Sequence, residues 1–377
     1  MCRTYRTGVY MSQERINRIR TWMKEQGIDA FLVTQPQNRS YLSGWLNDDT
    51  EGSGMLLIDQ QQQFVLTNPL YQEVATNEAN GWTVLVPESR QYAPAIATLA
   101  QTHGWKKIGF ESPSLTYAEY ERFTKAGEGA YTLVPFEQTV ISELREVKDA
   151  HELDLLKKAI AITDDTFTHI CQWIQPGMTE KSVQMEITRK MVELGADGPS
   201  FSAIVASGPN GSMPHAVPGE RRIERGELIT IDMGARYKGY CADMTRTICL
   251  GEPKEALMSE VYDAVLHAMK VCEAGLRAGI SGKAGDALAR EALAMEGLDQ
   301  YYVHSTGHGV GLQIHEGPNL SARAPEDAPL PVGTVVTVEP GVYIQGWSGT
   351  RVEDCVLLKE DGAEVLTQSP TTLVINR

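Results

Sequence analysis

Two aspartates face each other across a predicted strand pair in residues 229–247, ITIDMGARYKGYCADMTRT. Apolar and polar residues alternate on both sides of its centre, which is typical of half-buried strands. If the pair folds about its middle, between Tyr237 and Lys238, Asp232 lies directly opposite Asp243. Opposed carboxylates repel each other and are costly to bury. A fold that contains this pair must therefore bring a cation to it or leave it in solvent.

The same arrangement recurs in residues 335–358, VVTVEPGVYIQGWSGTRVEDCVLL. Glu339 and Glu353 are equally distant from Gly346, which lies in a turn-forming run. The alternation also puts a threonine or an arginine on the face of each carboxylate pair, with Thr245 in the first pair and Thr337 and Arg351 in the second. One such pair alone is more often a register error or a solvated edge. Two pairs with the same geometry favour a buried site.

Metal ions would remove the repulsion between these carboxylates. Two divalent ions about 3.5–4 Å apart, bridged by carboxylates, form the usual hydrolytic arrangement. Residues 304–316, HSTGHGVGLQIHE, supply histidines in a glycine-rich loop, where glycine allows close approach of the backbone. The sequence therefore predicts that Asp232 and Asp243 bind metal. His304 precedes His308 by four residues but forms no HExxH motif, so we expect His304 to support the loop.

Composition excludes several other classes of protein. The net charge of −15 argues against nucleic acid as a partner, and no apolar run approaches a membrane span. The first residues, MCRTYRTGVYMSQERINR, contain no apolar core of a signal peptide. The scattered cysteines are then expected to be free thiols in the cytoplasm. The GHGVG run opens no helix after a strand, and Ser207 lies in no GxSxG elbow, so neither a dinucleotide site nor a serine hydrolase is supported.

The length of 377 residues predicts two domains. We expect an N-terminal extension at residues 1–10, an α/β domain at 11–145 and an α+β domain at 146–377, because helices and strands alternate only in the first part. Helices are predicted at residues 13–26, 94–103, 116–125, 148–173, 178–197, 254–275 and 284–295. Strands are predicted at 29–33, 54–59, 63–68, 82–87, 106–111, from 201 onward and between 334 and 358.

Four motifs, in order, are IDMGARYKGYCADMTRT, HSTGHGVGLQIHE, VEPGVY and TRVEDCV. They strongly resemble the M24 metallopeptidase family of aminopeptidase P, prolidase and methionine aminopeptidase. The resemblance covers nearly the whole chain and is closest to the branch of Xaa-Pro aminopeptidases and Xaa-Pro dipeptidases. It implies a C-terminal pita-bread fold at residues 146–377, preceded by a creatinase/prolidase-type domain at 11–145. Methionine aminopeptidases generally lack such an N-terminal domain.

The resemblance also implies roles for single residues. Asp232 corresponds to a bidentate ligand, Asp243 and Glu353 to the two bridging ligands, and His308 and Glu339 to ligands of one metal. Glu339 is also the expected proton shuttle. Three further catalytic residues are implied: His215 and His315, which would contact the substrate and the tetrahedral intermediate, and Arg351, which matches an arginine of the proline-specific branch. Thr245 and Thr337 would orient carboxylates.

The implied activity is hydrolysis of the N-terminal Xaa-Pro bond of short peptides by a hydroxide that bridges two metal ions. Hard oxygen ligands favour Mn, and Co or Zn would also suit the site. We expect an Xaa-Pro aminopeptidase, with an Xaa-Pro dipeptidase (prolidase) as the alternative, and a homodimer whose N-terminal domain restricts substrates to short peptides. Two remoter alternatives are a metal-independent creatinase- or ectoine-type hydrolase and a non-catalytic pita-bread module. Such relatives lose metal ligands, whereas all the expected ligands are present here.

Overall fold

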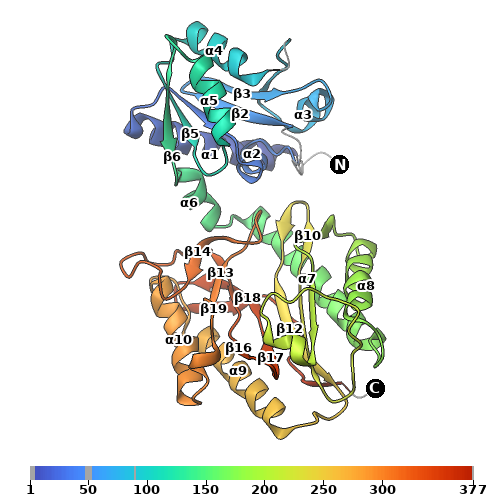
Figure 1. Cartoon of the computed structure of the whole chain (residues 1–377). Coiled ribbons are helices and arrows are strands. Elements are labelled where there is room, and N and C mark those ends of the chain that lie inside the picture. The colour runs from blue at the N-terminus through green and yellow to red at the C-terminus, as the bar shows by residue number, and fades with distance from the viewer. Residues whose placement is uncertain (1–4, 47–52, 89–90, 376–377) are drawn as a thin grey trace. The chain divides into compact units, whose positions relative to one another are not determined.

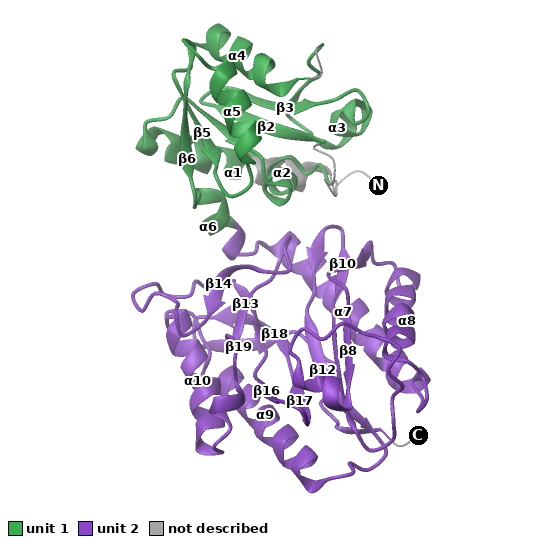
Figure 2. Ribbon diagram, in the orientation of Figure 1, with its two compact units in different colours: residues 1–144 green, residues 145–377 purple. Residues whose placement is uncertain are grey.

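The chain divides into two compact units, Met1–Leu144 (unit 1) and Arg145–Arg377 (unit 2), coloured separately in Figure 2. The computed structural model describes residues 5–46, 53–88 and 91–375, with side chains from residue 13 onward. Within these ranges, no helix is long and apolar enough to cross a membrane. The cysteines there are all free thiols, and Cys2 lies outside the described residues.

Unit 1 is a mixed sheet with helices on both faces. Its strands lie in the order β4-β3-β2-β1-β5-β6, with β1 antiparallel to β2 and parallel to β5. The strands are β1 (Ala30–Val33), β2 (Gly54–Asp59), β3 (Gln63–Thr67), β4 (Thr83–Leu85), β5 (Lys107–Glu111) and β6 (Thr132–Phe136). The helices are α1 (Tyr5–Gln26), α2 (Pro36–Ser43), α3 (Gln72–Glu78), α4 (Tyr92–His103), α5 (Tyr117–Ala126) and α6 (Val140–Glu146).

Successive side chains of β1 point to opposite faces of the sheet, and each face packs against different helices. The ring of Phe31 contacts Trp22 of α1, whereas Leu32 lies in the core that includes Ile96 of α4. All predicted elements of this unit are present. Helix α1 begins at Tyr5, so part of the predicted extension at residues 1–10 is helical, and residues 1–4 lie outside the described part.

Unit 2 places two helix pairs on opposite sides of its strands (Figure 1). Helices α7 (Ala150–Trp173) and α8 (Glu180–Glu193) pack on one side, and α9 (Ala256–Gly275) and α10 (Gly282–Met295) pack on the other. Capping residues set the starts of three of them. Asp149 and Glu152 form a capping box on α7, the predicted cap Thr179 accepts from Ser182 N, and Ser281 caps α10.

Two principal sheets form the interior of unit 2. One has the order β20-β12-β9-β8 and the other the order β14-β13-β15-β18-β19. The strands and 3₁₀ turns are β7 (Gly198–Pro199), β8 (Ile204–Ser207), η1 (Gly208–Ser212), β9 (Leu228–Met233), β10 (Ala235–Tyr237), β11 (Tyr240–Cys241), β12 (Met244–Leu250), η2 (Asp299–Tyr301), β13 (Gly307–Gly309), β14 (Glu316–Leu320), β15 (Val335–Val338), β16 (Gly341–Ile344), β17 (Ser348–Arg351), β18 (Asp354–Lys359), β19 (Gly362–Val365) and β20 (Val374–Ile375).

The first carboxylate hairpin has a different register from the one that the sequence predicted. Asp232 pairs with Thr245, so the prediction that it lies directly opposite Asp243 is wrong by two residues. The turn falls on Lys238 and Gly239, whose φ angles of 47° and 82° both lie in the left-handed region that a two-residue hairpin loop requires. A shift of two residues keeps the same face, so both aspartates still point to one side.

The second hairpin follows the predicted register. Val338 pairs with Asp354, and Gly341 pairs with Arg351, around a turn at Gly346 where φ is 77°. However, the hairpin is not one continuous ladder. Strands β16 and β17 form a separate two-stranded sheet, and the chain leaves the main sheet at the point where Glu339 and Glu353 lie.

A candidate metal centre in unit 2

The predicted metal ligands lie at the ends of neighbouring strands in unit 2. Asp232 lies in β9, Asp243 immediately precedes β12, and His308 lies in β13. Glu339 follows β15 and Glu353 precedes β18. These strands belong to both principal sheets, so residues far apart in the sequence converge at one place.

Three of these side chains are close enough to share one ion. Oxygens of Asp243 and Glu353 and a ring nitrogen of His308 all lie within 4.8 Å of one another. Glu339 joins them, with its Oε1 3.3 Å from Nε2 of His308. Asp232 is outside this group of three, and its Oδ2 pairs with Nη2 of Arg351 at 2.6 Å.

The chemistry of this donor set fits divalent cations. Within the part of the chain that the structure describes, the buried atoms Oδ1 of Asp232 and Oε1 of Glu353 have no hydrogen-bond partner. Burial raises the pKa of Asp243 and of Glu353, and the carboxylates nearby raise both further. Burial also raises the pKa of Glu339, to about 8. Buried acceptors that repel one another and lack donors are what a bound cation would satisfy.

His308 is held in the form that can bind metal. Burial lowers its pKa to about 4, so the imidazole is neutral at pH 7. Its Nδ1 lies 3.0 Å from the carbonyl oxygen of Gly309, which fixes the ring and leaves Nε2 toward the carboxylates. The predicted loop contains strand β13 at this point. Gly307 is required there, since a Cβ would lie 1.9 Å from the carbonyl oxygen of Thr337.

Threonines beside the carboxylates orient them, as predicted. Oγ1 of Thr245 donates to Oε2 of Glu353 at 2.7 Å, and Oγ1 of Thr337 lies 3.4 Å from Oε1 of Glu339. Arg351 links this face to Asp232, because its Nε donates to Oγ1 of Thr245 at 3.0 Å. These contacts fix the carboxylates before any ion binds.

Tyr343 is a site residue that the sequence did not reveal. Its hydroxyl accepts from Nη1 of Arg351 at 2.6 Å and lies 2.9 Å from Nε2 of His304. His304 also contacts the carbonyl oxygen of Ser305 through Nδ1, at 2.8 Å. Both ring nitrogens of His304 thus contact protein atoms, in agreement with the prediction that this histidine supports the loop.

The two predicted substrate-contacting histidines, His215 and His315, are exposed, whereas the candidate ligands are buried or, for Glu339, half-buried. The His315 ring lies 4.4 Å from that of His308, centroid to centroid. Burial of part of the His315 ring lowers its pKa, which favours the neutral form. The other histidines of unit 2 are peripheral: His151 and His267 are exposed, and His169 pairs with Glu186.

Glu180 holds the loop that carries His215, and it too was missed in the sequence. This buried carboxylate accepts from Ser207 N at 2.8 Å, from Nδ2 of Asn210 at 3.1 Å and from Gly219 N at 3.3 Å. It therefore ties both ends of the loop to the start of α8. In the sequence, Glu180 is indistinguishable from an ordinary acidic residue in the first turn of a helix.

Metal binding should release protons at neutral pH. The raised pKa values of Asp243, Glu353 and Glu339 mean that the metal-free folded chain holds protons that a cation displaces. The apparent affinity for Mn²⁺ should therefore increase from about pH 6 to about pH 8. Titration calorimetry in two buffers of different ionisation enthalpy measures the released protons, and identical heats in both buffers would contradict the prediction.

The same shifts predict how the metal-free protein responds to pH. The folded state binds more protons than the unfolded state between the unperturbed carboxyl pKa and the raised one, which is about 8 for Glu339. The stabilisation is therefore fully present below that window and is lost as pH rises through it. Thermal unfolding of chelator-treated protein should show a Tm that falls across this range, whereas saturating Mn²⁺ should flatten the dependence.

A buried cluster of carboxylates with one neutral imidazole is a donor set of the kind that binds divalent cations in metal-dependent enzymes. Residues 154–360 match the sequence profile of metallopeptidase family M24, and residues 15–147 match that of the creatinase/prolidase N-terminal domain. The chain belongs to metallopeptidase family M24, and it is an exopeptidase with the pita-bread fold in unit 2.

Relatives of the whole chain carry names from the proline-specific branch. The chain is 38% identical to the solved structure of an Xaa-Pro dipeptidase from Bacillus anthracis, with a TM-score of 0.91 over 96% of this chain and 99% of that one. It is 34% identical to the structure of an X-Pro aminopeptidase from Thermotoga maritima, with a TM-score of 0.85 over 96% and 100%. It is also 34% identical to an Xaa-Pro dipeptidase from Pyrococcus furiosus, over 96% of this chain and 100% of that protein. The chain is thus a prolidase-like M24 peptidase.

Proposed function

We propose that this chain is an Xaa-Pro aminopeptidase that uses two divalent metal ions, with Mn²⁺ as the favoured ion. The observation that carries this proposal is the buried group of Asp243, His308 and Glu353, with Glu339 against it and unpartnered carboxylate oxygens beside it. Asp232 completes the proposed ligand set. Oxygen-rich sites with a single imidazole suit Mn²⁺, and Co²⁺ or Zn²⁺ remain compatible with the same donors.

When bound, such ions generate a nucleophile from water at neutral pH and polarise the scissile carbonyl. The chain's own residues then have distinct tasks. Glu339, whose Oε1 lies beside Nε2 of His308 in the candidate ligand group, would accept a proton from the attacking water and return it to the leaving amine. His315 and His215 would donate hydrogen bonds to the substrate carbonyl as charge develops on its oxygen. Arg351 holds Asp232 in orientation through their ion pair.

The position of Arg351 supports the aminopeptidase over the dipeptidase. A dipeptide carries its own C-terminal carboxylate next to the proline, and this group needs a cation partner. The Arg351 guanidinium is already engaged with Asp232, Tyr343 and Thr245. With a further bond from Nη1 to the carbonyl oxygen of Pro214, four of its five N–H groups are in use among the described residues, so Arg351 has at most one N–H left for such a carboxylate and cannot bind it through two parallel bonds. An Xaa-Pro dipeptidase is the second candidate, because the relatives in Bacillus anthracis and Pyrococcus furiosus bear that name.

The proposal is tested by stripping the protein with chelator, restoring Mn²⁺ and comparing Ala-Pro-Ala with Ala-Pro. Preferred, metal-dependent cleavage of the tripeptide after alanine is the expected result. Preference for the dipeptide would instead establish the second candidate. Ala-Ala-Ala serves as the control peptide without proline. If all three peptides are cut at similar rates, or none is cut with metal bound, the proline specificity proposed here is wrong.

We also propose that the protein is a homodimer in the cytoplasm. The free thiols at Cys171, Cys241, Cys249, Cys272 and Cys355 support a reducing compartment. The dimer is inferred from family resemblance, and light scattering coupled to size-exclusion chromatography measures it directly. A mass near the 41.5 kDa of one chain would contradict the dimer.

A further inference from the structure

Arg246 is a fully buried arginine immediately behind the candidate metal centre. It lies in β12 next to Thr245, whose hydroxyl donates to Glu353. Because side chains alternate along a strand, Arg246 points away from the carboxylates, to the opposite face. Only 1% of its surface is exposed. No step of the proposed chemistry uses this residue.

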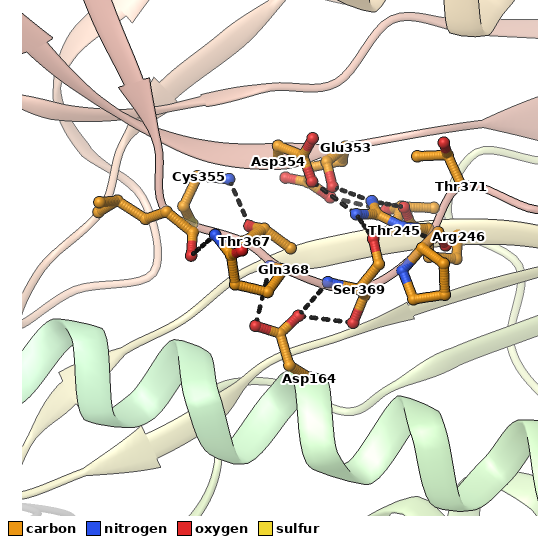
Figure 3. Close-up of polar contacts among 12 residues, drawn as sticks. Asp164, Thr245, Arg246, Glu353, Asp354, Cys355, Thr367, Gln368, Ser369 and Thr371 are labelled. Atoms are coloured by element: carbon orange, nitrogen blue, oxygen red, sulfur yellow. Dashed lines mark hydrogen bonds and ion pairs between the residues drawn. The ribbon is translucent and has the colours of Figure 1, made fainter.

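All the N–H groups of the Arg246 guanidinium have acceptors, and they come from three parts of the chain (Figure 3). Nη1 donates to the carbonyl oxygens of Glu353 at 2.5 Å and of Thr245 at 3.0 Å. Nη2 donates to Oδ1 of Asp354 at 2.6 Å and to the carbonyl oxygen of Ser369 at 2.8 Å. Nε donates to the carbonyl oxygen of Pro370 at 3.2 Å. Only an arginine offers this many donors in one rigid plane.

The segment that supplies two of these acceptors, residues 366–370, is itself held on two sides. Its Leu366 N donates to the carbonyl oxygen of Cys355 in β18, at 2.8 Å. From the other side, Asp164 of α7 accepts from Gln368 N at 3.0 Å and from Ser369 N at 2.8 Å (Figure 3). The chain then continues into β20, which pairs with β12. The segment thus bridges the two principal sheets of unit 2.

This arrangement opposes the repulsion within the centre. Asp243 precedes β12 and Glu353 precedes β18, and a carboxylate oxygen of one lies within 4.8 Å of a carboxylate oxygen of the other. Ionised carboxylates this close repel each other, and the repulsion tends to separate the ends of the two strands unless a cation compensates it. Arg246 joins the main chain at Thr245 directly to the main chain at Glu353, with residues 366–370 bracing it from behind.

We propose that Arg246 is a positioning residue for the metal centre, which sets the spacing between the strand ends that carry Asp243 and Glu353. The inference rests on the proposed function in that it takes these two carboxylates as metal ligands. Groups that support metal ligands typically change metal affinity about 10- to 100-fold when removed. A lysine in this position keeps the charge but cannot reach acceptors on three segments at once.

The test compares Arg246→Lys with a matched control, Arg221→Lys. Arg221 pairs with Glu227 elsewhere in unit 2 and contacts none of the candidate ligands. Mn²⁺ affinity is measured without substrate, by competition with a fluorescent chelator, and Tm is recorded with chelator present. We expect Arg246→Lys to bind Mn²⁺ at least about 10-fold more weakly and the control to stay within about 2-fold. Unchanged affinity in a folded Arg246→Lys overturns the inference, as does an equal loss in both variants.

A measurement on the unaltered chain covers the case in which Arg246→Lys does not fold. Hydrogen–deuterium exchange is followed by mass spectrometry with and without Mn²⁺. Binding should slow exchange in the peptide that covers residues 366–370 as well as in the one that covers Glu353. Slowing at Glu353 alone contradicts the inference.

These readouts separate the inference from the proposed function. A chain that binds Mn²⁺ with the expected Arg246 dependence but cuts no Xaa-Pro peptide refutes the substrate and leaves the positioning role intact. If the parent chain cuts the peptides and Arg246→Lys binds Mn²⁺ normally, the proposed substrate is supported and the positioning role is refuted. If the parent chain binds no divalent ion, both fail together.

Discussion

Replacing Glu339 with glutamine should lower kcat/KM for Ala-Pro-Ala by about 10³-fold or more, since both a metal ligand and a proton carrier are lost. Oε1 of Glu339 lies 3.3 Å from Nε2 of His308, inside the group of candidate ligands. The proposed role of this carboxyl is to take a proton from the attacking water and to return it to the leaving amine. Glutamine has nearly the same shape but cannot do this. Steady-state kinetics at saturating Mn²⁺ provides the measurement.

Glu186→Gln is the control for this experiment. Glu186 lies on α8 in the same unit and pairs with His169 and Arg189, away from the centre. The same change of charge there should leave kcat/KM within about 2-fold, as is usual for surface substitutions. If Glu339→Gln retained more than a tenth of the parent activity, Glu339 would be neither an essential ligand nor the proton carrier.

Replacing Glu353 with glutamine should remove most of the stabilisation that metal confers. At 100 times its Kd, a ligand stabilises the folded state by about 2.7 kcal/mol. For a domain of 150–250 residues this corresponds to a rise in Tm of about 5–10 °C. Oε1 of Glu353, like Oδ1 of Asp232, is buried without a hydrogen-bond partner among the described residues, so a cation would satisfy it. The variant should show a rise below about 2 °C.

For the metal-free state we expect the reverse: Glu353→Gln should not lower the Tm. Burial and the charges of Glu339 and Asp232 raise the pKa of Glu353, so its ionised form destabilises the metal-free fold. At about pH 8, chelator-treated Glu353→Gln should therefore unfold at the same temperature as the treated parent or at a higher one. Differential scanning fluorimetry with and without Mn²⁺ gives both values. An undiminished Mn²⁺ effect in the variant would exclude Glu353 as a ligand.

The carboxylate pairs could be predicted from the sequence because a strand has a period of two. That period keeps Asp232 with Asp243 and Glu339 with Glu353 on common faces after any register shift of an even number of residues. The register itself depends on the turn. A symmetric fold of residues 229–247 centres the turn one residue too early, whereas Lys238 and Gly239 both adopt positive φ. In the second hairpin, the midpoint between Glu339 and Glu353 is Gly346, which is also a preferred turn residue. The predicted register of that hairpin is therefore correct.

Groups that act through the main chain could not be predicted. Arg246 binds carbonyl oxygens of Glu353, Ser369 and Pro370, and carbonyl oxygens carry no residue-specific signal. The sequence likewise gives no sign of the contacts of Tyr343 and Glu180, because their partners come from distant segments. The short helices α2, α3 and α6 were also not predicted. Helices of this length depend on tertiary packing more than on their own sequence.

Residues 366–370, which accept hydrogen bonds from Arg246, come late in the chain, and this has a consequence for the order in which the site forms during synthesis. During synthesis, the ribosome releases β9, β12 and β13 well before Glu353 and residues 366–370. A nascent chain therefore exposes Asp232, Asp243 and His308 without the partners that complete the site, and domains fold as units once their sequence has emerged. We therefore expect the centre to be completed only once residues 366–370 have left the ribosome. A chain interrupted before Leu366 would lack the acceptors that Arg246 uses at Ser369 and Pro370.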